Sequence, residues 1–315
     1  MTHPAMTSRP LGSTALPVTP LCVGTSALGS MPRLYGYEVA AERALATLRA
    51  VFAGPIRFLD TSNGYAGGDS ERLIGGVLAE LGGVPEGFLL ATKVDPDASG
   101  DFSGARVRRS VAESQQRLGL DYLPLVYLHD PERISFESAM GPGGAVDALL
   151  SLRQEGTIGH LGVAGGPVDM LGRYVDTGAF EVVLTHNRYT LVDQSAAPLL
   201  DQCRTAGVAV VNGAPFGGGI LAKGPSEQPR YAYREAPPAV LGAVDRISRI
   251  CQRYGVPLAA AALQWSIRDD RIASTVVGIT RPERVQETVA LAQWPIPADL
   301  WTELKDGSVS VDFRN

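Results

Sequence analysis

The sequence has no excess of basic residues, little cysteine and no long apolar run, and each shortage argues against a class of protein. Its 28 lysines and arginines are outnumbered by 33 aspartates and glutamates, giving a formal net charge of −5. Without a basic stripe, neither nucleic acid nor an anionic membrane is expected as a main partner. No apolar run approaches the roughly 20 residues that cross a bilayer, and the N-terminus lacks the pattern of a signal peptide. We therefore expect a cytoplasmic protein.

Cysteine and histidine are both too sparse and too scattered to suggest a disulfide framework or a metal site. The three cysteines, Cys22, Cys203 and Cys251, lie far apart in apolar segments without CxxC spacing, which predicts buried, reduced thiols. Four histidines occur, one of them (His3) close to the N-terminus, and none forms an HxH pair. A metal-dependent barrel hydrolase needs clustered ligands, so it is the weakest hypothesis, and no metal is expected.

Short apolar runs alternate with helical patterns along the chain. The runs are almost continuously apolar, as expected of strands buried on both faces of a parallel sheet. The predicted strands are residues 21–25, 56–60, 88–93, 124–129, 160–164, 181–187, 208–213 and 274–278. The predicted helices are residues 38–52, 69–81, 103–119, 143–156, 195–207, 239–254, 257–268 and 282–292. Eight strands alternating with helices predict an α/β fold, a closed (β/α)₈ TIM barrel.

The helix ends carry recognisable signals. Asp69 or Ser70 could cap the helix predicted at 69–81. Three other helices are predicted to stop at glycine, the residue that most readily ends a helix in a left-handed conformation: Gly119, Gly156 and Gly207.

No linker is long enough to divide the chain. We therefore expect one domain over residues 1–315, with residues 1–8 as a flexible tail. Residues 221–238, "LAKGPSEQPRYAYREAPP", predict an irregular surface loop in an enlarged interval between the seventh and eighth strands.

Four polar residues fall at the ends of three adjacent predicted strands. Asp60 ends the second strand, Lys93 the third and His129 the fourth, and Tyr65 lies on the loop after the second. Taken singly, each has an ordinary explanation, such as a turn cap, a half-buried aromatic or a solvated lysine. In a barrel, however, strand ends meet at the mouth where active sites lie. Their common position therefore favours a functional set.

The chemistry of this set fits acid–base work on a carbonyl or alcohol oxygen. A tyrosine has an ordinary pKa near 10, too high for ready proton exchange at neutral pH. We expect the Lys93 ammonium to lower the pKa of Tyr65, and the Asp60 carboxylate to keep Lys93 protonated. His129 could orient the substrate oxygen. The set holds no electron carrier, so redox chemistry would require a cofactor.

These residues lie in recognisable segments. The strings "LDTSNGY", "ATKV" and "VYLHDP" resemble those of the aldo-keto reductase superfamily, whose catalytic tetrad would be Asp60, Tyr65, Lys93 and His129. The resemblance runs from "RPLGSTALPVTPLCVGT" to "GITRPERVQETV". It implies a barrel with a short N-terminal hairpin. Further segments, among them "NRYTLVDQSA" and "YGVPLAAAALQW", resemble the branch with L-fucose or D-threo-aldose 1-dehydrogenase and pyridoxal 4-dehydrogenase.

The resemblance also implies a nicotinamide cofactor, NAD or NADP, lying extended across the barrel mouth. The family has no Rossmann domain, and the absence of a strand-linked GxGxxG agrees with that. Gly278 replaces a lysine of many NADP-preferring members, whereas Arg281 could attract a 2′-phosphate, so both cofactors stay open. The residues that the resemblance assigns to the cofactor are Gly24, Thr25, Asp60, Asn187, Pro215, Phe216, Gly217, Gly219, Leu221, Thr280, Arg281, Arg284 and Glu287.

One departure from the family concerns the nicotinamide carboxamide. Most members hold it with a Ser-Asn pair after the fifth strand, where this chain has Ala164 and Gly165. The contact must then come from elsewhere, and Asn187 or His186 is the candidate.

The expected substrate is a small molecule in a pocket lined by aromatic residues. Tyr231 and Tyr233 could join the pocket, but we interpret them as surface loop residues. The oligomeric state, monomer or homodimer, stays open. The residues assigned to substrate are Tyr35, Tyr65, His129 and Phe216, with Arg33, Leu34 and Tyr37 nearby.

Two hypotheses of function remain beside the metal hydrolase. The first is an NAD(P)-dependent oxidoreductase acting on an aldose, an aldehyde or the corresponding alcohol, similar to a sugar 1-dehydrogenase. The second is a cofactor-binding redox sensor or scaffold protein with slow turnover.

Overall fold

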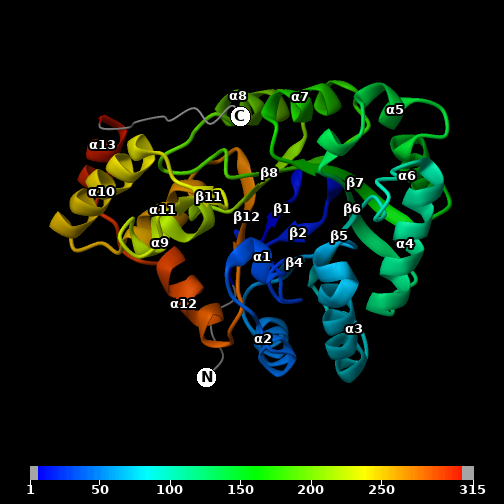
Figure 1. The fold of residues 1–315 in the computed structure, drawn as a ribbon, viewed down its shortest axis with the longest axis horizontal. Coiled ribbons are helices and arrows are strands. Elements are labelled where there is room, and N and C mark those ends of the chain that lie inside the picture. The colour runs from blue at the N-terminus through cyan, green and yellow to red at the C-terminus, as the bar shows by residue number, and fades with distance from the viewer. Residues whose placement is uncertain (1–5, 307–315) are drawn as a thin grey trace.

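Eight parallel strands close into a barrel in this computed structural model, which describes residues 6–306. The strand order is β12-β3-β4-β5-β6-β7-β8-β9 (Figure 1), so each predicted strand pairs with its neighbours in sequence and the last pairs with the first. Every predicted strand is present, with ends within two residues of those expected. The strands are β3 (Leu21–Gly24), β4 (Phe58–Asp60), β5 (Leu89–Val94), β6 (Leu123–His129), β7 (Ile158–Gly165), β8 (Val182–His186), β9 (Ala209–Gly213) and β12 (Ile272–Gly278).

Helices surround the strands (Figure 1), and all eight predicted helices are present. They are α2 (Ala41–Ala53), α3 (Asp69–Leu81), α4 (Gly104–Leu118), α6 (Ala145–Gln154), α8 (Ala197–Ala206), α10 (Pro238–Arg253), α11 (Leu258–Ile267) and α12 (Glu283–Ala292). Sequence analysis did not predict α1 (Pro32–Tyr35), α5 (Phe136–Met140), α7 (Val168–Asp176), α9 (Ile220–Lys223) and α13 (Ala298–Asp306). α7 is short and has Gly172 at its centre, which weakens its intrinsic helical tendency. Within residues 6–306, every helix is too short or too polar to span a lipid bilayer.

The helix-end predictions were partly right. Gly119 and Gly207 are left-handed C-caps, and Gly156 lies one residue beyond the cap of α6. Neither Asp69 nor Ser70 caps α3, because Gly68 occupies the N-cap position. The Ser70 hydroxyl instead donates to Thr25.

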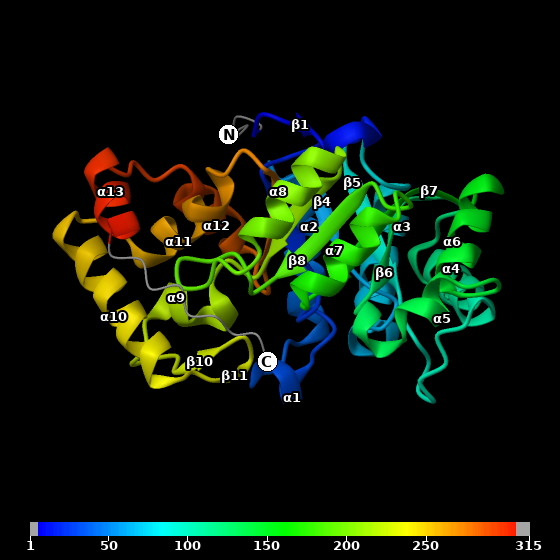
Figure 2. The same ribbon diagram turned by 90° about the horizontal axis from the view of Figure 1, so that it is seen from above.

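A short hairpin closes one end of the barrel. β1 (Arg9–Pro10) pairs antiparallel with β2 (Pro17–Val18). Two residues of this hairpin, Leu11 and Val18, are fully buried in the cluster that fills the barrel interior. Figure 2 shows β1 at the opposite end of the molecule from α1 and from the pair β10 (Arg230–Tyr231) and β11 (Arg234–Glu235). The hairpin agrees with the prediction, although residues 1–5 of the expected tail lie outside the described part of the chain.

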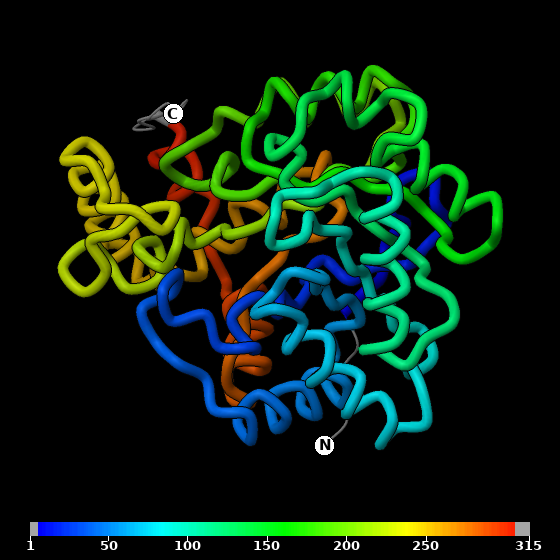
Figure 3. Tube along the Cα trace, turned by 45° about the vertical axis from the view of Figure 1, so that its right-hand side comes forward, coloured from blue at the N-terminus to red at the C-terminus, as the bar shows by residue number. Residues whose placement is uncertain are grey.

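The segment between β9 and β12 is more ordered than predicted. Instead of an irregular loop, residues 221–238 hold the end of α9 and the β10–β11 pair. The side chain of Tyr231 is 2% exposed, and its hydroxyl donates to the Asn187 carbonyl oxygen. This segment and α10 form the yellow lobe beside the barrel in Figure 3. Its apolar side chains make a second core against α11 and α13.

The three cysteines are buried and free of disulfides, as predicted.

Helices α3 and α4 approach so closely that one glycine is required between them. A Cβ at Gly75 would lie 2.0 Å from the backbone oxygen of Arg117, whereas a Cβ at the next residue, Gly76, would meet nothing within 4 Å. We expect Gly75→Ala to lower the free energy of unfolding by about 1–3 kcal/mol, because backbone must shift to admit the methyl group. Gly76→Ala is the matched control and should stabilise by about 0.5–1 kcal/mol.

Urea unfolding followed by circular dichroism measures both changes. Equal midpoints for the two variants would contradict this packing.

Candidate active site

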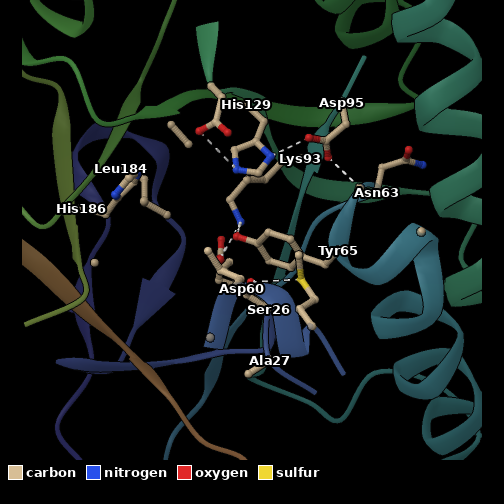
Figure 4. A pocket seen from close by; sticks show the side chains of 18 of the residues that line it. Ser26, Ala27, Asp60, Asn63, Tyr65, Lys93, Asp95, His129, Leu184 and His186 are labelled. Carbon is tan, nitrogen blue, oxygen red and sulfur yellow. Dashed lines mark hydrogen bonds and ion pairs between the residues drawn. The ribbon is translucent and has the colours of Figure 1, made fainter. Parts of the chain in front are cut away.

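The four residues singled out from the sequence meet at one cavity at the carboxyl ends of the strands. Asp60 ends β4, Lys93 lies in β5, His129 ends β6, and Tyr65 opens the turn at residues 65–68 after β4. The cavity measures about 850 Å³ and all four line it. Figure 4 shows their side chains converging from these elements.

Lys93 is the centre of the group. Its side chain is 1% exposed, and its ammonium donates to three oxygens: Asp60 Oδ1 at 2.6 Å, the Thr61 carbonyl at 2.7 Å and the Tyr65 hydroxyl at 3.0 Å. Three donors and three acceptors leave the ammonium fully satisfied. Burial raises the pKa of the Asp60 carboxyl, against the opposing effect of the Lys93 charge. Lys93 therefore contacts both Asp60 and Tyr65, the two residues with which the sequence predicts it to interact.

The expected direction of the Tyr65 pKa was wrong. Burial of the phenol raises its pKa well above the ordinary value, and acidic neighbours add to the rise. The Lys93 charge is already matched by Asp60 at 2.6 Å. It therefore does not offset the loss of solvation. The neighbours that add to the rise are the Asp60 carboxylate, the Tyr35 phenol and the carboxylates of Asp95 and Asp130. At neutral pH, Tyr65 is an un-ionised phenol and hence a proton donor.

A polar network ties the Tyr65 turn to α4. The Arg106 guanidinium donates to Asn63 Oδ1 at 2.9 Å, and the Arg117 guanidinium donates to the Asn63 carbonyl at 2.9 Å. Asn63 in turn donates to Glu113 at 3.1 Å. Because Asn63 lies two residues before Tyr65, this network fixes where the phenol points.

Sequence analysis missed this network. Arg106, Glu113 and Arg117 belong to a helix that was predicted, but no role was predicted for these three side chains. A signal was present, because spacings of seven and four residues place Arg106, Glu113 and Arg117 on one face of a helix.

Asp95 is another cavity residue that was not predicted from the sequence. It follows β5 directly and is 4% exposed. Its Oδ1 lies 2.7 Å from His129 Nδ1, and its Oδ2 accepts from the Ser62 hydroxyl and from the Gly64 amide. Burial acts to raise the pKa of Asp95, but the contacts with His129, Ser62 and Gly64 outweigh it and hold that pKa well below the ordinary value. Asp95 is therefore a carboxylate at neutral pH.

The opposite wall of the cavity carries Leu184, Ala164 and His186. Burial lowers the pKa of His186 to about 4, so its ring is neutral at neutral pH. Next to it, Asn187 is 4% exposed, and its Oδ1 has no hydrogen-bond partner. An unpaired buried acceptor is costly unless a ligand satisfies it.

Tyrosines form the rim of the cavity. Two expectations for this region were wrong, one for Tyr231 and Tyr233 and one for Phe216. Tyr35 and Tyr37 line the cavity as expected, and Tyr233 does so too, with its ring centroid 5.6 Å from that of Tyr35. Tyr231 is buried, and Tyr233 is half-buried in the cavity lining, so the expectation that both are surface loop residues was wrong. Phe216, expected at the substrate, instead packs against the core clusters.

Two of the glycines assigned to the cofactor, Gly217 and Gly219, lie in a tight turn at residues 217–219, which the family resemblance implies as the pyrophosphate-binding loop. The Gly217 amide donates to the Ala214 carbonyl and the Gly219 amide to the Phe216 carbonyl, both at 2.9 Å. These two N–H groups are used within the turn, so their role in binding phosphate stays a prediction. Pro215 and Leu221 flank the turn and are buried.

Four other residues assigned to the cofactor lie around the start of α12, in the segment that the family resemblance implies as the adenosine-binding part: Thr280, Arg281, Arg284 and Glu287. Arg281 pairs with Glu287 at 3.3 Å, and Arg284 lies 3.6 Å from the same carboxylate. The two partners of the first pair are about half exposed. Thr280 lies within hydrogen-bond reach of Tyr37 on the cavity rim. This places the segment beside the cavity, where its role also stays a prediction.

The other two residues assigned to the cofactor lie at the end of β3. Gly24 lines the cavity, and Thr25 is fully buried, with its hydroxyl donating to the Asp60 carbonyl at 2.9 Å. Thr25 therefore supports the backbone beneath Asp60. Within residues 6–306, no group of three histidine, cysteine or acidic side chains is placed to hold a metal ion.

A parallel barrel with an acid, a lysine, a phenol and an imidazole buried at its strand ends defines a class of acid–base sites that act on an oxygen atom. Comparison with known proteins gives the family. Residues 20–307 match the model of the aldo/keto reductase family, so the chain belongs to that family of oxidoreductases.

Two curated relatives and one solved structure are similar over nearly their whole length. D-threo-aldose 1-dehydrogenase of a Pseudomonas species is 32% identical, with 92% of this chain and 94% of that protein covered. L-galactose dehydrogenase of Arabidopsis thaliana is 34% identical, with 90% and 86% covered. An aldo-keto reductase of Bacillus halodurans, solved in its holo form, shares the fold with a TM-score of 0.78 at 22% identity, with 98% and 100% covered.

The low pKa of His186 makes stability depend on pH. The folded-state pKa of about 4 lies below the ordinary value of about 6.5, so the unfolded chain binds a proton that the folded chain excludes. The wild-type free energy of unfolding should therefore fall by up to about 3 kcal/mol more than that of His186→Gln as the pH drops from 6.5 to 4.

Urea unfolding at several pH values measures the difference. Parallel pH profiles for wild type and His186→Gln would show that His186 is not held neutral in the folded chain.

Proposed function

We propose that this chain is an NAD(P)-dependent oxidoreductase that interconverts an aldose or aldehyde and the corresponding oxidised or reduced compound, similar to a sugar 1-dehydrogenase. The observation that carries the proposal is the Lys93 ammonium, buried between Asp60 and Tyr65 at 2.6 and 3.0 Å. This arrangement places the phenol hydrogen of Tyr65 at the barrel mouth, where a substrate oxygen would lie.

Tyr65 is the proton donor of the proposed reaction. Its phenol stays protonated because its site is buried and surrounded by acidic groups. Lys93 holds the phenol oxygen in place and can stabilise the phenolate that forms once the proton leaves. His129, whose ring centroid lies 5.7 Å from that of Tyr65, stands beside the place where the substrate oxygen would lie. Asp60 supplies the countercharge for Lys93.

The cavity offers groups that fit a nicotinamide cofactor. Asn187 directly follows the cavity-lining His186, and its unpaired Oδ1 is an acceptor suited to a carboxamide N–H; it would take the place of the Ser-Asn pair that Ala164 and Gly165 replace. Leu184 and Ala164 supply an apolar wall for a flat ring. When bound, the nicotinamide would supply or accept the hydride. Arg281 is paired with Glu287, so its side chain alone does not select NADP over NAD.

The proposed substrate class rests on the lining of the cavity and on the relatives. The lining of the cavity combines tyrosine hydroxyls with Asp130 and Arg133, which suit a compound rich in hydroxyl groups. The two relatives described above act, by their names, on an aldose and on L-galactose. Pyridoxal 4-dehydrogenase of Microbacterium luteolum is also 31% identical, with 97% and 99% covered, so pyridoxal belongs in any substrate panel.

Replacing Tyr65 by phenylalanine tests the proposal directly. We expect Tyr65→Phe to lower kcat/KM by about 10²–10⁴-fold, the usual contribution of a positioned acid or base. The measurement is absorbance at 340 nm with NAD(H) and NADP(H) separately, on L-fucose, L-galactose, D-arabinose, pyridoxal and simple aldehydes. Tyr122→Phe is the matched control, because Tyr122 is 51% exposed and does not line the cavity.

Wild-type rates in Tyr65→Phe would overturn the assignment. Tight cofactor binding by wild type with negligible turnover across the panel would favour the redox sensor or scaffold protein instead.

A further inference from the structure

We propose that Asp95 is a positioning residue that fixes the His129 ring with its hydrogen on Nδ1, leaving Nε2 to accept a hydrogen bond from a substrate hydroxyl. The first half of this inference rests on contacts within the chain. The second half, concerning substrate, rests on the oxidoreductase function proposed above.

Asp95 can only be a hydrogen-bond acceptor in this environment. Its Oδ2 accepts from the Gly64 amide at 2.7 Å and from the Ser62 hydroxyl, and its Oδ1 faces His129 Nδ1 at 2.7 Å. A protonated carboxyl group would have to place its hydrogen against one of these partners, two of which are donors. The low pKa of Asp95 agrees with this reading. An ionised carboxylate accepts and never donates.

The neighbours of Nδ1 therefore require that nitrogen to carry a hydrogen. Besides Asp95 Oδ1, the Ser62 oxygen lies 3.1 Å from Nδ1. The Ser62 hydrogen is already directed to Asp95, so its oxygen faces the ring with a lone pair. A bare Nδ1 would then oppose two electron-rich oxygens. A protonated Nδ1 satisfies both of them, so in the neutral ring the hydrogen lies on Nδ1 and Nε2 is bare.

Nε2, the other ring nitrogen, is open toward the cavity. The nearest acidic group is Asp130, whose Oδ1 lies 3.7 Å from Nε2, beyond hydrogen-bond range. The other Asp130 oxygen accepts from Arg133 at 3.0 Å. Asp60 and Glu132 also interact electrostatically with His129. The other titratable groups near the ring are Lys93, whose three hydrogens are used elsewhere, Tyr65, whose ring meets that of His129 at 79°, and His186, which is neutral at neutral pH.

This geometry distinguishes the two oxidation states of a substrate. A neutral ring protonated on Nδ1 offers a lone pair at Nε2, which binds the hydrogen of an alcohol or hemiacetal. A carbonyl oxygen can only accept, so it gains no hydrogen bond from that nitrogen and depends on the Tyr65 phenol. Asp95 thus adapts the site to substrates that present a hydroxyl group at the reacting carbon. This role of Asp95 could not be predicted from the sequence, because Asp95 and His129 lie 34 residues apart.

The tautomer is measurable by NMR without substrate or cofactor. The chain has four histidines, so ¹⁵N-histidine labelling gives few signals, and those of His129 are assigned from a His129→Gln sample. At a pH where the ring is neutral, wild type should show a protonated Nδ1 and a bare Nε2. A protonated Nε2 with a bare Nδ1 would overturn the proposal. Because this measurement uses the wild-type protein, it does not depend on the folding of any Asp95 variant.

Kinetics test the consequence for substrate. Asp95→Asn should abolish the tautomer preference and raise KM for an alcohol or hemiacetal substrate about tenfold, while the dissociation constant for the cofactor stays within about twofold of wild type. Asp121→Asn is the control, because Asp121 is exposed just before β6, at the opposite end of the strand from His129. It should change neither quantity.

The outcomes separate the two proposals. Suppose that the wild-type protein has the predicted tautomer but turns over no substrate. This result would refute the oxidoreductase function and, with it, the second half of the inference. The positioning role of Asp95 would still stand. An active enzyme whose Asp95→Asn variant keeps both KM and the tautomer would refute the inference and leave the function standing. A parallel loss of cofactor and substrate binding would reveal a merely structural role and would also refute it.

Discussion

The site depends on one buried charge, the Lys93 ammonium. Removing such a charge from water costs several kcal/mol unless its surroundings replace the lost hydration. Asp60 at the end of β4 provides the countercharge, and the Thr61 carbonyl and the Tyr65 hydroxyl take the other two hydrogens. The hydrogen bond that stabilises the buried Lys93 ammonium therefore fixes the position of Tyr65. The loop between β4 and α3 must keep the shape that brings the phenol oxygen to that ammonium.

The surroundings of Lys93 are held in place by a second set of buried polar groups. Arg106 and Arg117 on α4 fix Asn63, and Asp95 accepts from the Gly64 amide, so the residues just before Tyr65 are held from two sides. The close packing of α3 on α4 at Gly75 keeps these elements at the required separation. Packing and electrostatics thus serve the same geometry.

The barrel could be predicted from the sequence because its signals are local. Each strand is a short apolar run followed by a helical pattern, and the chain order of the strands is also their order around the barrel. The four cavity residues could be predicted because the ends of adjacent parallel strands must lie together. Their contacts with Lys93 followed from this arrangement.

What could not be predicted depends on partners distant in sequence. The link between Asp95 and His129, and the network of Asn63 with α4, appear only when separate elements are packed together. The predicted shift in the pKa of Tyr65 had the wrong direction, because burial and the nearby carboxylates of Asp60, Asp95 and Asp130 are properties of the folded cavity. Tyr231 and Tyr233 were misjudged for the same reason, since their loop folds back over the barrel mouth.

A double-mutant cycle on Asp60 and Lys93 tests the central claim most directly. The measured quantity is kcat/KM for Asp60→Asn, Lys93→Met and the two combined. If Asp60 acts through Lys93, the double variant should be no slower than Lys93→Met alone, because the effects of residues that work as a unit do not add. Losses that multiply in the double variant would show that Asp60 and Lys93 act independently, and would contradict the account.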